Sequence, residues 1–317
     1  MTYRYCGNSG LQLPLISLGL WHNFGDTDSF SEARNMILFA FEKGITHFDL
    51  ANNYGPPPGS AERNFGKILS SDLKSHRDEM VISSKAGHLM WDGPYGDGGS
   101  RKHLMASIDQ SLRRTGLEYF DIFYTHRYDS NTPVEETIQA LIDIVKQGKA
   151  LYIGVSKYPP EEAEKAYRIM ASQNVPCLIY QDKYNLFHRN PEKQAFSLIE
   201  KYKLGFIAFS PLAQGLLTNR YINGIPENSR AARPDGFLTK DAITKEVISQ
   251  VKQLNQIAAR RGQTLAEMAL AWIINKKQTT SVIVGASSVS QLNDNINAIA
   301  NYTFSEEELI QIDSIIQ

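Results

Sequence analysis

Short apolar runs and amphipathic stretches alternate along the whole chain. Eight runs rich in β-branched and aromatic residues predict strands, at Ile16–Trp21, Thr46–Ala51, Met80–Ala86, Asp121–His126, Leu151–Ser156, Leu178–Asp182, Gly205–Leu212 and Ser281–Ser287. Helical periodicity fills the intervals, at Ser31–Lys43, Ala61–Leu69, Lys102–Thr115, Val134–Gln147, Pro160–Ser172, Glu192–Tyr202, Leu265–Asn275 and Gln291–Ala300. The alternation predicts an α/β fold.

Eight strand–helix units without a linker favour one closed parallel barrel, a (β/α)8 or TIM barrel, with residues 1–317 as a single domain. The competing open, doubly wound sheet carries a GxGxxG turn after its first strand, which the segment after Trp21 lacks. Three segments lie outside the repeat. Tyr3–Pro14 predicts an N-terminal β-hairpin on the barrel floor, and Lys245–Arg261 and Ser305–Ile316 predict two additional helices.

Composition and charge narrow the choice of partners. The 317 residues carry a formal net charge of -1, which gives no bulk attraction to nucleic acid or to an anionic membrane. The sequence shows no signal peptide and no apolar run near the roughly 18 residues of a membrane helix. The two cysteines, Cys6 and Cys177, fit no metal-binding spacing. We therefore expect a reduced, cytoplasmic protein without a metal site.

Polar side chains stand at the carboxyl ends of nearly all the predicted strands, where catalytic groups gather in this kind of barrel. They belong to Asp49, Tyr54, Lys85, His126, Ser156, Gln181, Ser210 and Ser287. A buried strand end does not tolerate such groups unless a ligand or a hydrogen-bond network satisfies them. The pattern therefore predicts a binding site on this face.

Four of these residues suit the reduction of a carbonyl group. Tyr54 would protonate the developing alkoxide, and a nearby Lys85 ammonium would lower the pKa of the phenol. Asp49 would hold Lys85 charged and in place. A neutral His126 would donate a hydrogen bond to the substrate oxygen and orient the carbonyl.

The segments around these four residues resemble the aldo-keto reductases. The resemblance rests on Phe48–Gly55, with its Asp-x4-Tyr spacing, and on Ser83–Lys85 and Tyr124–His126. It implies that Tyr54 is the general acid, that Lys85 and Asp49 tune it, and that His126 orients the substrate.

The same resemblance implies a bound NADPH. Phe209–Thr218 is similar to the loop that wraps the pyrophosphate, and Gly285–Asn295 is similar to the segment that holds the adenosine and its 2′-phosphate. The residues expected at the cofactor are Trp21, Asp49, Ser156, Gln181, Phe209, Ser210, Pro211, Leu212, Gly215, Arg220, Arg230, Gly285, Ser287, Gln291 and Asn295. The basic positions favour NADPH over NADH, since arginine suits phosphate.

Three longer stretches resemble one branch of the family, the bacterial L-glyceraldehyde 3-phosphate reductases, which are related to the beta subunits of potassium channels. These stretches are Gly19–Gly25, Asn52–Glu62 and Pro94–Lys102. The likeness implies reduction of L-glyceraldehyde 3-phosphate, of methylglyoxal, or of both. It also implies a homo-oligomer, a tetramer or an octamer.

A substrate phosphate needs a cation near the active face, and Arg101, Arg127 and Lys157 are candidates by position. Lys157 is also a departure, because many relatives have asparagine after the serine that corresponds to Ser156.

Two other functions compete with catalysis of reduction. One is a regulatory subunit that binds NADPH, like the channel beta subunits, although these relatives replace the histidine that stands here as His126. The other is an aldolase that forms a Schiff base through Lys85.

Overall fold

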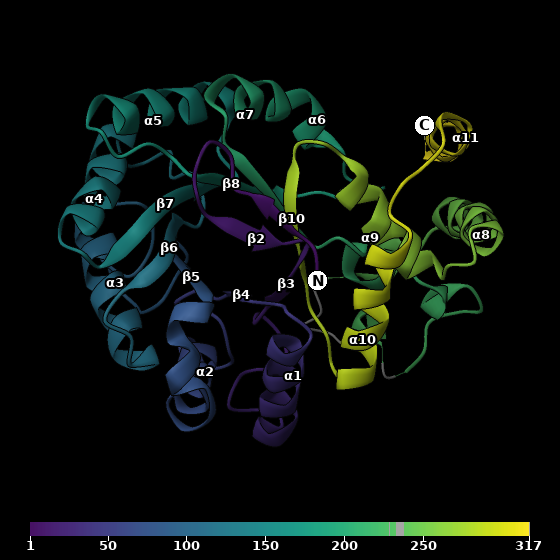
Figure 1. The fold of residues 1–317 in the computed structure, drawn as a ribbon, viewed down its shortest axis with the longest axis horizontal. Coiled ribbons are helices and arrows are strands. Elements are labelled where there is room, and N and C mark those ends of the chain that lie inside the picture. Colours follow the sequence, from purple (N-terminus) through teal and green to yellow (C-terminus); the bar gives the residue numbers. More distant parts are fainter. Residues whose placement is uncertain (228, 233–237, 317) are drawn as a thin grey trace.

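The computed structural model describes residues 1–227, 229–232 and 238–316, and a closed barrel of eight parallel strands lies at their centre (Figure 1). Neighbouring strands follow the chain order, and the last strand closes on the first. The strands are β3 (Ile16–Gly19), β4 (His47–Asp49), β5 (Val81–Ala86), β6 (Phe120–Thr125), β7 (Ala150–Ser156), β8 (Ile179–Lys183), β9 (Gly205–Phe209) and β10 (Thr279–Val284). The predicted (β/α)8 barrel is confirmed.

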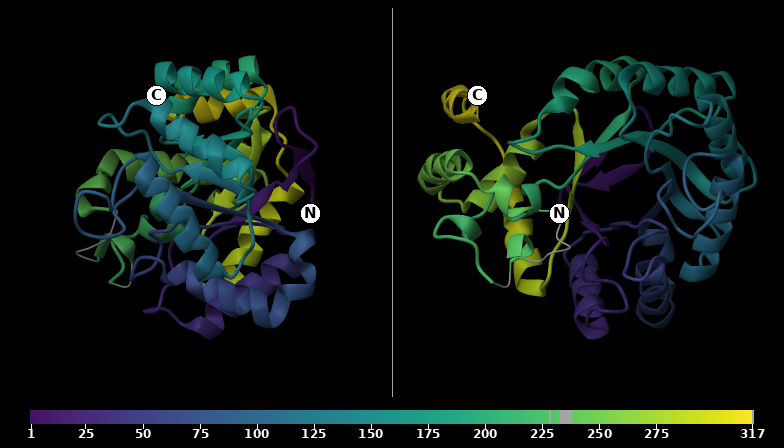
Figure 2. Two further views of the ribbon diagram at one scale, coloured as in Figure 1. Left: turned by 90° about the vertical axis from the view of Figure 1, so that its left-hand side faces the viewer. Right: turned by 180° about the vertical axis from the view of Figure 1, so that it is seen from behind.

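Helices cover the outside of the barrel, as the side and rear views in Figure 2 show. They are α1 (Phe30–Glu42), α2 (Ser60–Ile68), α3 (Arg101–Thr115), α4 (Val134–Lys146), α5 (Pro160–Ser172), α6 (Asn190–Gln194), α7 (Phe196–Tyr202), α9 (Leu265–Asn275) and α10 (Val289–Asn297). The two additional helices, α8 (Lys245–Arg260) and α11 (Glu306–Ile316), pack against each other beside the barrel (Figure 1). Among the described residues, no helix has the length and apolar character to cross a membrane.

Backbone conformation explains where the observed boundaries differ from the predicted ones. The strand predicted to reach Leu212 ends at Phe209, because Ser210 takes a left-handed φ of 52° and turns the chain out of the sheet. The helix predicted over Glu192–Tyr202 is two helices, since Ala195 has a non-helical φ of -121°. The last strand is displaced toward the N-terminus and ends at Val284.

The predicted N-terminal hairpin closes the floor of the barrel. Its strands β1 (Tyr3–Tyr5) and β2 (Gln12–Pro14) pair antiparallel. Arg4 donates hydrogen bonds to the carbonyl oxygen of Ile274, near the end of α9, and to that of Thr279, at the start of β10. The longer loops lie at the opposite end of the barrel, where the parallel strands terminate.

Close packing fills the barrel interior and brings polar groups near its centre. Tyr124 on β6 is fully buried, and its ring lies where a side chain at Gly154 on β7 would stand. A Cβ at Gly154 would come within 2.5 Å of that ring, so this position requires glycine. The ammonium of Lys85 lies 5.9 Å from the centre of the Tyr124 ring.

A buried ion pair ties the outer helices α2 and α3 to strand β5. Glu62 is completely buried, and its carboxylate accepts hydrogen bonds from Ser84 Oγ at 2.7 Å and from Arg114 Nε at 2.6 Å. A buried carboxylate without its cation is strongly destabilising, because the desolvation of the charge is no longer offset.

We therefore expect Arg114→Met to lower the free energy of unfolding by about 3 kcal/mol, measured by urea denaturation. Arg113→Met is the matched control, because Arg113 is exposed on the same helix, and it should change stability by less than about 0.5 kcal/mol. Equal stabilities of the two variants would contradict the role given to the Glu62–Arg114 pair.

Candidate active site

Three of the four predicted catalytic residues stand where consecutive strands end. Asp49 is the last residue of β4, Lys85 is the penultimate residue of β5, and His126 directly follows β6. Tyr54 lies in the loop after β4, and its ring centre is 5.2 Å from Lys85 Nζ and 5.9 Å from the centre of the His126 ring. The structure therefore brings together the four side chains that the sequence singled out.

Lys85 and Asp49 form an ion pair inside the barrel. Lys85 is 0% exposed and Asp49 is 2% exposed. Lys85 Nζ donates to Asp49 Oδ2 at 2.5 Å and to the carbonyl oxygen of Leu50 at 2.7 Å. Asp49 Oδ1 accepts from Ser83 Oγ at 2.7 Å and from Gln181 Nε2 at 3.3 Å. Both charges are thus offset by hydrogen bonds as well as by each other.

A chain of buried hydrogen bonds leads from Asp49 back across the barrel. Ser83 Oγ is 3.0 Å from His47 Nε2, His47 Nδ1 is 2.8 Å from Ser17 Oγ, and Ser17 Oγ is 2.6 Å from Ser281 Oγ. Ser83 gives its one proton to Asp49, so it must accept from a protonated Nε2 of His47. A neutral His47 then accepts at Nδ1 from Ser17, which accepts from Ser281. Every donor in the chain points toward Asp49.

Burial lowers the pKa of His47 to about 4, and the Asp49 charge opposes this shift only in part. The imidazole is therefore neutral at neutral pH, as the hydrogen-bond chain requires. The His47 side chain is fully buried inside the barrel.

The phenol of Tyr54 stays protonated in this site. Burial, reinforced by the negative charge of Asp49, raises the pKa of Tyr54 well above its usual value. The direction of this shift is opposite to the one expected from Lys85, because its causes are burial and the carboxylate of Asp49. A protonated phenol is nevertheless the form that can donate a proton. Trp21 covers it from one side, with ring centres 6.2 Å apart.

His126 is neutral. Burial lowers its pKa well below the usual value, and the positive charges of Lys85, Lys157 and Arg127 act in the same direction. Its Nδ1 atom is buried and has no hydrogen-bond partner within the described ranges. The ring packs against the rings of Tyr54 and His88, the latter at 4.4 Å between ring centres.

The ends of β7, β8 and β9 present groups that fit a nicotinamide. Ser156 Oγ is buried and lacks a hydrogen-bond partner in the part of the chain that is described. Gln181 is 2% exposed and its side chain reaches Asp49. Phe209, which ends β9, is partly buried. A carboxamide could satisfy the orphaned hydroxyl while its ring rests on the phenylalanine, so these residues fit the cofactor that the sequence implied.

The loop after β9 has a backbone conformation that suits anion binding by its main-chain amides rather than by its side chains. Ser210, Ala213 and Gln214 all have positive φ angles, and a 3-10 helix covers Ala213–Gly215. Asn185 Nδ2 donates to the carbonyl oxygen of Ser210 at 2.9 Å and so anchors the start of the loop. Successive amides in such a conformation form a concave site for anions. Pro211, Leu212 and Gly215, expected at the cofactor, all lie in this loop.

The segment between β10 and α10 has the features of a second anion site. The exposed Gly285 and Ser287 lead to Ser288, whose hydroxyl caps α10 by accepting from the amide of Gln291. Gln291 Oε1 accepts from the amide of Ser287 at 2.8 Å and from its hydroxyl at 3.0 Å. Asn295, one turn on, is 3% exposed, and its Nδ2 has no partner among the described atoms. A helix N-terminus with donor groups beside it attracts phosphate.

The two arginines expected at phosphate follow the β9 loop in the chain. Arg220 lies in the 3-10 helix Asn219–Tyr221, beyond the β9 loop. The side chain of Arg230 lies outside the described part of the structure.

Of the cations considered for a substrate phosphate, Arg101 lies outside the site. It forms an ion pair with Asp143 on α4, on the outer wall. Lys157 and Arg127 instead lie at the barrel mouth with His88, a residue that the sequence analysis did not select. No sequence motif marks His88, because its contacts depend on which loops come together at the barrel mouth.

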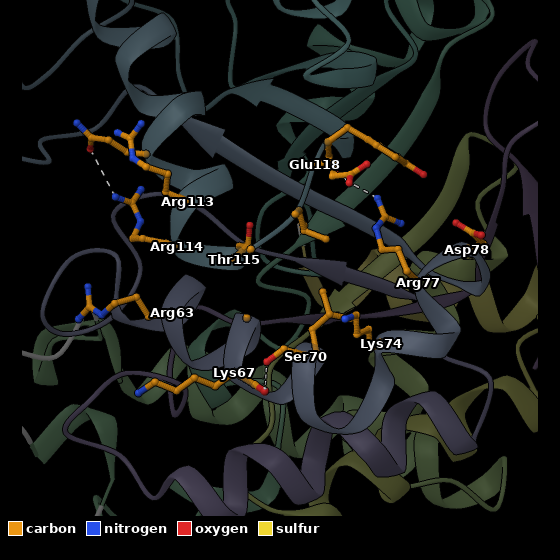
Figure 3. Close-up of a pocket in the computed structure, with 16 residues that line it drawn as sticks. Arg63, Lys67, Ser70, Lys74, Arg77, Asp78, Arg113, Arg114, Thr115 and Glu118 are labelled. Atoms are coloured by element: carbon orange, nitrogen blue, oxygen red, sulfur yellow. Dashed lines mark hydrogen bonds between the residues drawn. The ribbon is translucent and has the colours of Figure 1, made fainter.

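A separate groove lies elsewhere on the molecule. It has a volume of about 970 Å³ and lies between α2 and α3, where Figure 3 shows Arg63, Lys67 and Arg113 along its rim. Its lining residues, such as Arg77 and Thr115, precede β5 and β6 instead of following a strand. It therefore lies toward the barrel floor, away from the four candidate catalytic residues. Within the described ranges, His, Cys, Asp and Glu form no cluster of three that could hold a metal.

Comparison with known proteins agrees with this geometry. Residues 15–317 match the family model described as the aldo/keto reductase family. Over 317 residues the chain is 54% identical to the L-glyceraldehyde 3-phosphate reductase of Escherichia coli O157:H7, a match that covers 99% of this chain and 92% of the relative. It is 53% identical to the protein of the same name from Escherichia coli strain K12, with the same coverage.

The buried, neutral His47 should make the fold sensitive to acid. Its pKa is lower in the folded protein than in the unfolded chain, so its contribution to stability is complete above about pH 6.5 and is lost as the pH falls toward 4. Across that interval, the cost of keeping His47 neutral in the folded protein should lower the free energy of unfolding by about 3 kcal/mol.

His47→Gln tests this, because its amide can donate to Ser83 and its oxygen can accept from Ser17 but it cannot take up a proton. Free energies of unfolding between pH 7 and pH 4 should fall less steeply for H47Q than for the unaltered protein. Parallel pH profiles would show that His47 is not held neutral by the fold.

Proposed function

The chain belongs to the aldo/keto reductase family, and we propose that it reduces small aldehydes with NADPH, with L-glyceraldehyde 3-phosphate as substrate. Membership of the family makes it an oxidoreductase that uses a nicotinamide cofactor. The observation that carries the proposal is the buried Lys85–Asp49 pair directly beside Tyr54 and His126. The names of the two similar reductases support the choice of substrate.

In the proposed reaction the substrate carbonyl lies between Tyr54 and His126. The nicotinamide, when bound, supplies the hydride. The neutral His126 donates a hydrogen bond to the carbonyl oxygen and fixes its direction. As negative charge develops on that oxygen, the phenol of Tyr54 gives up its proton to it. The Lys85 ammonium, 5.2 Å from the ring centre, then stabilises the phenolate that remains.

The roles proposed for the cofactor-binding residues follow their positions. Ser156 and Gln181 would hydrogen-bond the carboxamide, and Phe209 would support the nicotinamide ring beside Trp21 and Asp49. The loop of Ser210, Pro211, Leu212 and Gly215 would hold the pyrophosphate through its amides, with Arg220 and Arg230 as further phosphate ligands. Gly285, Ser287, Gln291 and Asn295 would hold the adenosine and its 2′-phosphate.

The two competing functions are less well supported. A Schiff base requires an accessible, neutral amine, whereas Lys85 is 0% exposed and donates to Asp49 at 2.5 Å. A regulatory NADPH-binding subunit does not need the histidine that is kept here as His126, packed 5.9 Å from Tyr54 between ring centres.

Several finer features complete the proposal. We propose that methylglyoxal is a second substrate, since the proposed reaction at Tyr54 and His126 requires only a carbonyl group. A cytoplasmic location, a single domain over residues 1–317 and a homo-oligomer of four or eight subunits are proposed from the likeness to the reductase branch.

Replacement of Tyr54 by Phe should lower kcat about a hundredfold to ten-thousandfold, because it removes the proposed proton donor. NADPH oxidation with L-glyceraldehyde 3-phosphate and with methylglyoxal measures the effect, and the affinity for NADPH should be unchanged. Tyr95→Phe, in an exposed loop, is the control and should leave kcat unaltered. A Y54F variant that retains full kcat would exclude Tyr54 as the acid.

The choice of NADPH over NADH can be tested at Ser287. Ser287→Asp would place a negative charge beside the 2′-phosphate and should weaken NADPH binding about tenfold or more, with little effect on NADH. Ser290→Asp, at an exposed position in the first turn of α10, controls for the added charge. Quenching of protein fluorescence measures both affinities. Equal losses for the two cofactors would contradict a 2′-phosphate site at this position.

A further inference from the structure

A small cluster of basic side chains lies at the barrel mouth, next to His126. It consists of His88, which follows β5, Arg127, which follows β6, and Lys157, which follows β7. We call these three residues the mouth cluster. The reaction proposed above uses none of them.

The mouth cluster is in contact with the reacting end of the site. The His88 ring stands edge-on to the His126 ring, with centres 4.4 Å apart. Lys157 Nζ lies 3.3 Å from His88 Nε2. A chemical group held by Lys157 would therefore lie one imidazole ring beyond the group that is expected to hold the carbonyl oxygen.

Lys157 is built into this position and lacks an ionic partner. Its backbone has a left-handed φ of 56°, and its amide donates to the carbonyl oxygen of Gln181 at 3.2 Å. Its side chain is half-buried, and no carboxylate lies within ion-pair distance of its ammonium in the described structure.

The carboxylates nearest the mouth cluster are already engaged. Asp97 accepts from Arg127 Nη2 at 2.9 Å and from the amide of Gly98. Asp182 accepts from the amide of Lys183 at 2.7 Å and from the hydroxyl of Tyr180. Neither forms an ion pair with Lys157 among the described contacts, although the charge of Asp182 acts to raise the pKa of Lys157. The ammonium therefore keeps capacity for a further anionic ligand.

The electrostatics agree with the geometry. Burial lowers the pKa of Lys157 to about 8, and the positive charges of Lys85 and Arg127 add to this effect. Burial, Lys157 and Arg127 together lower the pKa of His88 to about 4, so His88 is neutral and can accept from the ammonium. An anion at Lys157 would relieve the crowding of positive charge.

We infer that Lys157, oriented by His88 and supported by Arg127, binds the phosphate of the aldehyde substrate. This inference rests on the function proposed above and assigns a part of the site to the substrate's anionic end. In L-glyceraldehyde 3-phosphate the phosphate ester is carried two carbons beyond the carbonyl carbon. A substrate whose carbonyl meets Tyr54 and His126 can therefore extend its phosphate past His88 to the half-buried ammonium.

The same phosphate chemistry could belong to the cofactor, whose pyrophosphate is expected at the nearby loop after β9. Lys157 Nζ lies 6.0 Å from the centre of the Phe209 ring, at the start of that loop. The two sources are separable, because a substrate site affects phosphorylated aldehydes alone and a cofactor site affects every aldehyde.

The test compares Lys157→Met with Lys157→Arg and with Arg101→Met. For each, KM and kcat are measured with L-glyceraldehyde 3-phosphate and with L-glyceraldehyde, and the Kd for NADPH is measured by fluorescence. We expect K157M to raise KM for the phosphorylated aldehyde about tenfold to a hundredfold, with a much smaller change for L-glyceraldehyde. K157R keeps the charge and should restore the preference, and R101M should behave like the unaltered enzyme.

Two outcomes would overturn the inference. One is a K157M variant whose KM values rise equally for both aldehydes or not at all. The other is a K157M variant with a raised Kd for NADPH and an unchanged ratio of the two KM values, which assigns Lys157 to the cofactor. If the unaltered enzyme reduces L-glyceraldehyde but not its phosphate, the proposed substrate itself is wrong. Circular dichroism of K157M and K157R checks that both variants are folded.

Discussion

The buried ion pair between Lys85 and Asp49 is the interaction on which the rest of this barrel interior depends. Taking an ammonium and a carboxylate out of water is costly, and their mutual attraction offsets the cost only when their remaining hydrogen-bonding capacity is also filled. Here Leu50, Ser83 and Gln181 fill it, from three different parts of the barrel. The strands around the pair must therefore supply polar groups at fixed heights, in an interior that is otherwise filled by apolar side chains.

The period of two along a strand explains how they do so. His47 and Asp49 on β4 point to the same side of the sheet, and so do Ser83 and Lys85 on β5. In the parallel register, Asp49 lies opposite Ser83, so the hydroxyl of one strand reaches the carboxylate of the next. Because Ser83 then has no second proton to give, the tautomer of His47 and the direction of the two serine hydroxyls behind it are determined. A single proton arrangement results, which holds the carboxylate in one orientation toward Lys85.

The sequence predicted the barrel and the four central residues because both depend on local pattern. Eight separate strand–helix units are visible one at a time, and a charged residue at a strand end is conspicuous. The supporting residues Ser17, Ser83 and Ser281 could not be identified in this way, since serine is unremarkable in a strand and its partner is decided by the register between strands. The same limit applies to His88, which acquires a neighbour in Lys157 only through the approach of two loops that lie far apart in sequence.

The pKa of Tyr54 was predicted in the wrong direction for a related reason. The sequence indicates that a lysine stands near the phenol, but not that an aspartate cancels its charge at rest and that the ring is buried. The resting phenol is consequently a poor acid and keeps its proton, as the proton donor proposed for this site must do before the substrate binds. The ammonium becomes effective when the proton has left, because it then faces a phenolate as well as a carboxylate.

In the mechanism and substrate site proposed above, this arrangement separates the chemistry of the site from its choice of substrate. The ion pair and its hydrogen-bond chain lie within the strands, where four of their residues are fully buried: Lys85, Ser17, His47 and Ser281. A change in side-chain volume there disturbs the close packing of the barrel interior. His88 and Lys157 instead follow the ends of β5 and β7, and His88 contacts the candidate catalytic residues through the ring of His126. A substitution in these loops can alter which aldehyde is favoured while the proton donor and its supporting pair stay in place. Loop residues can therefore vary in a barrel of this kind without loss of the reaction that the strands support.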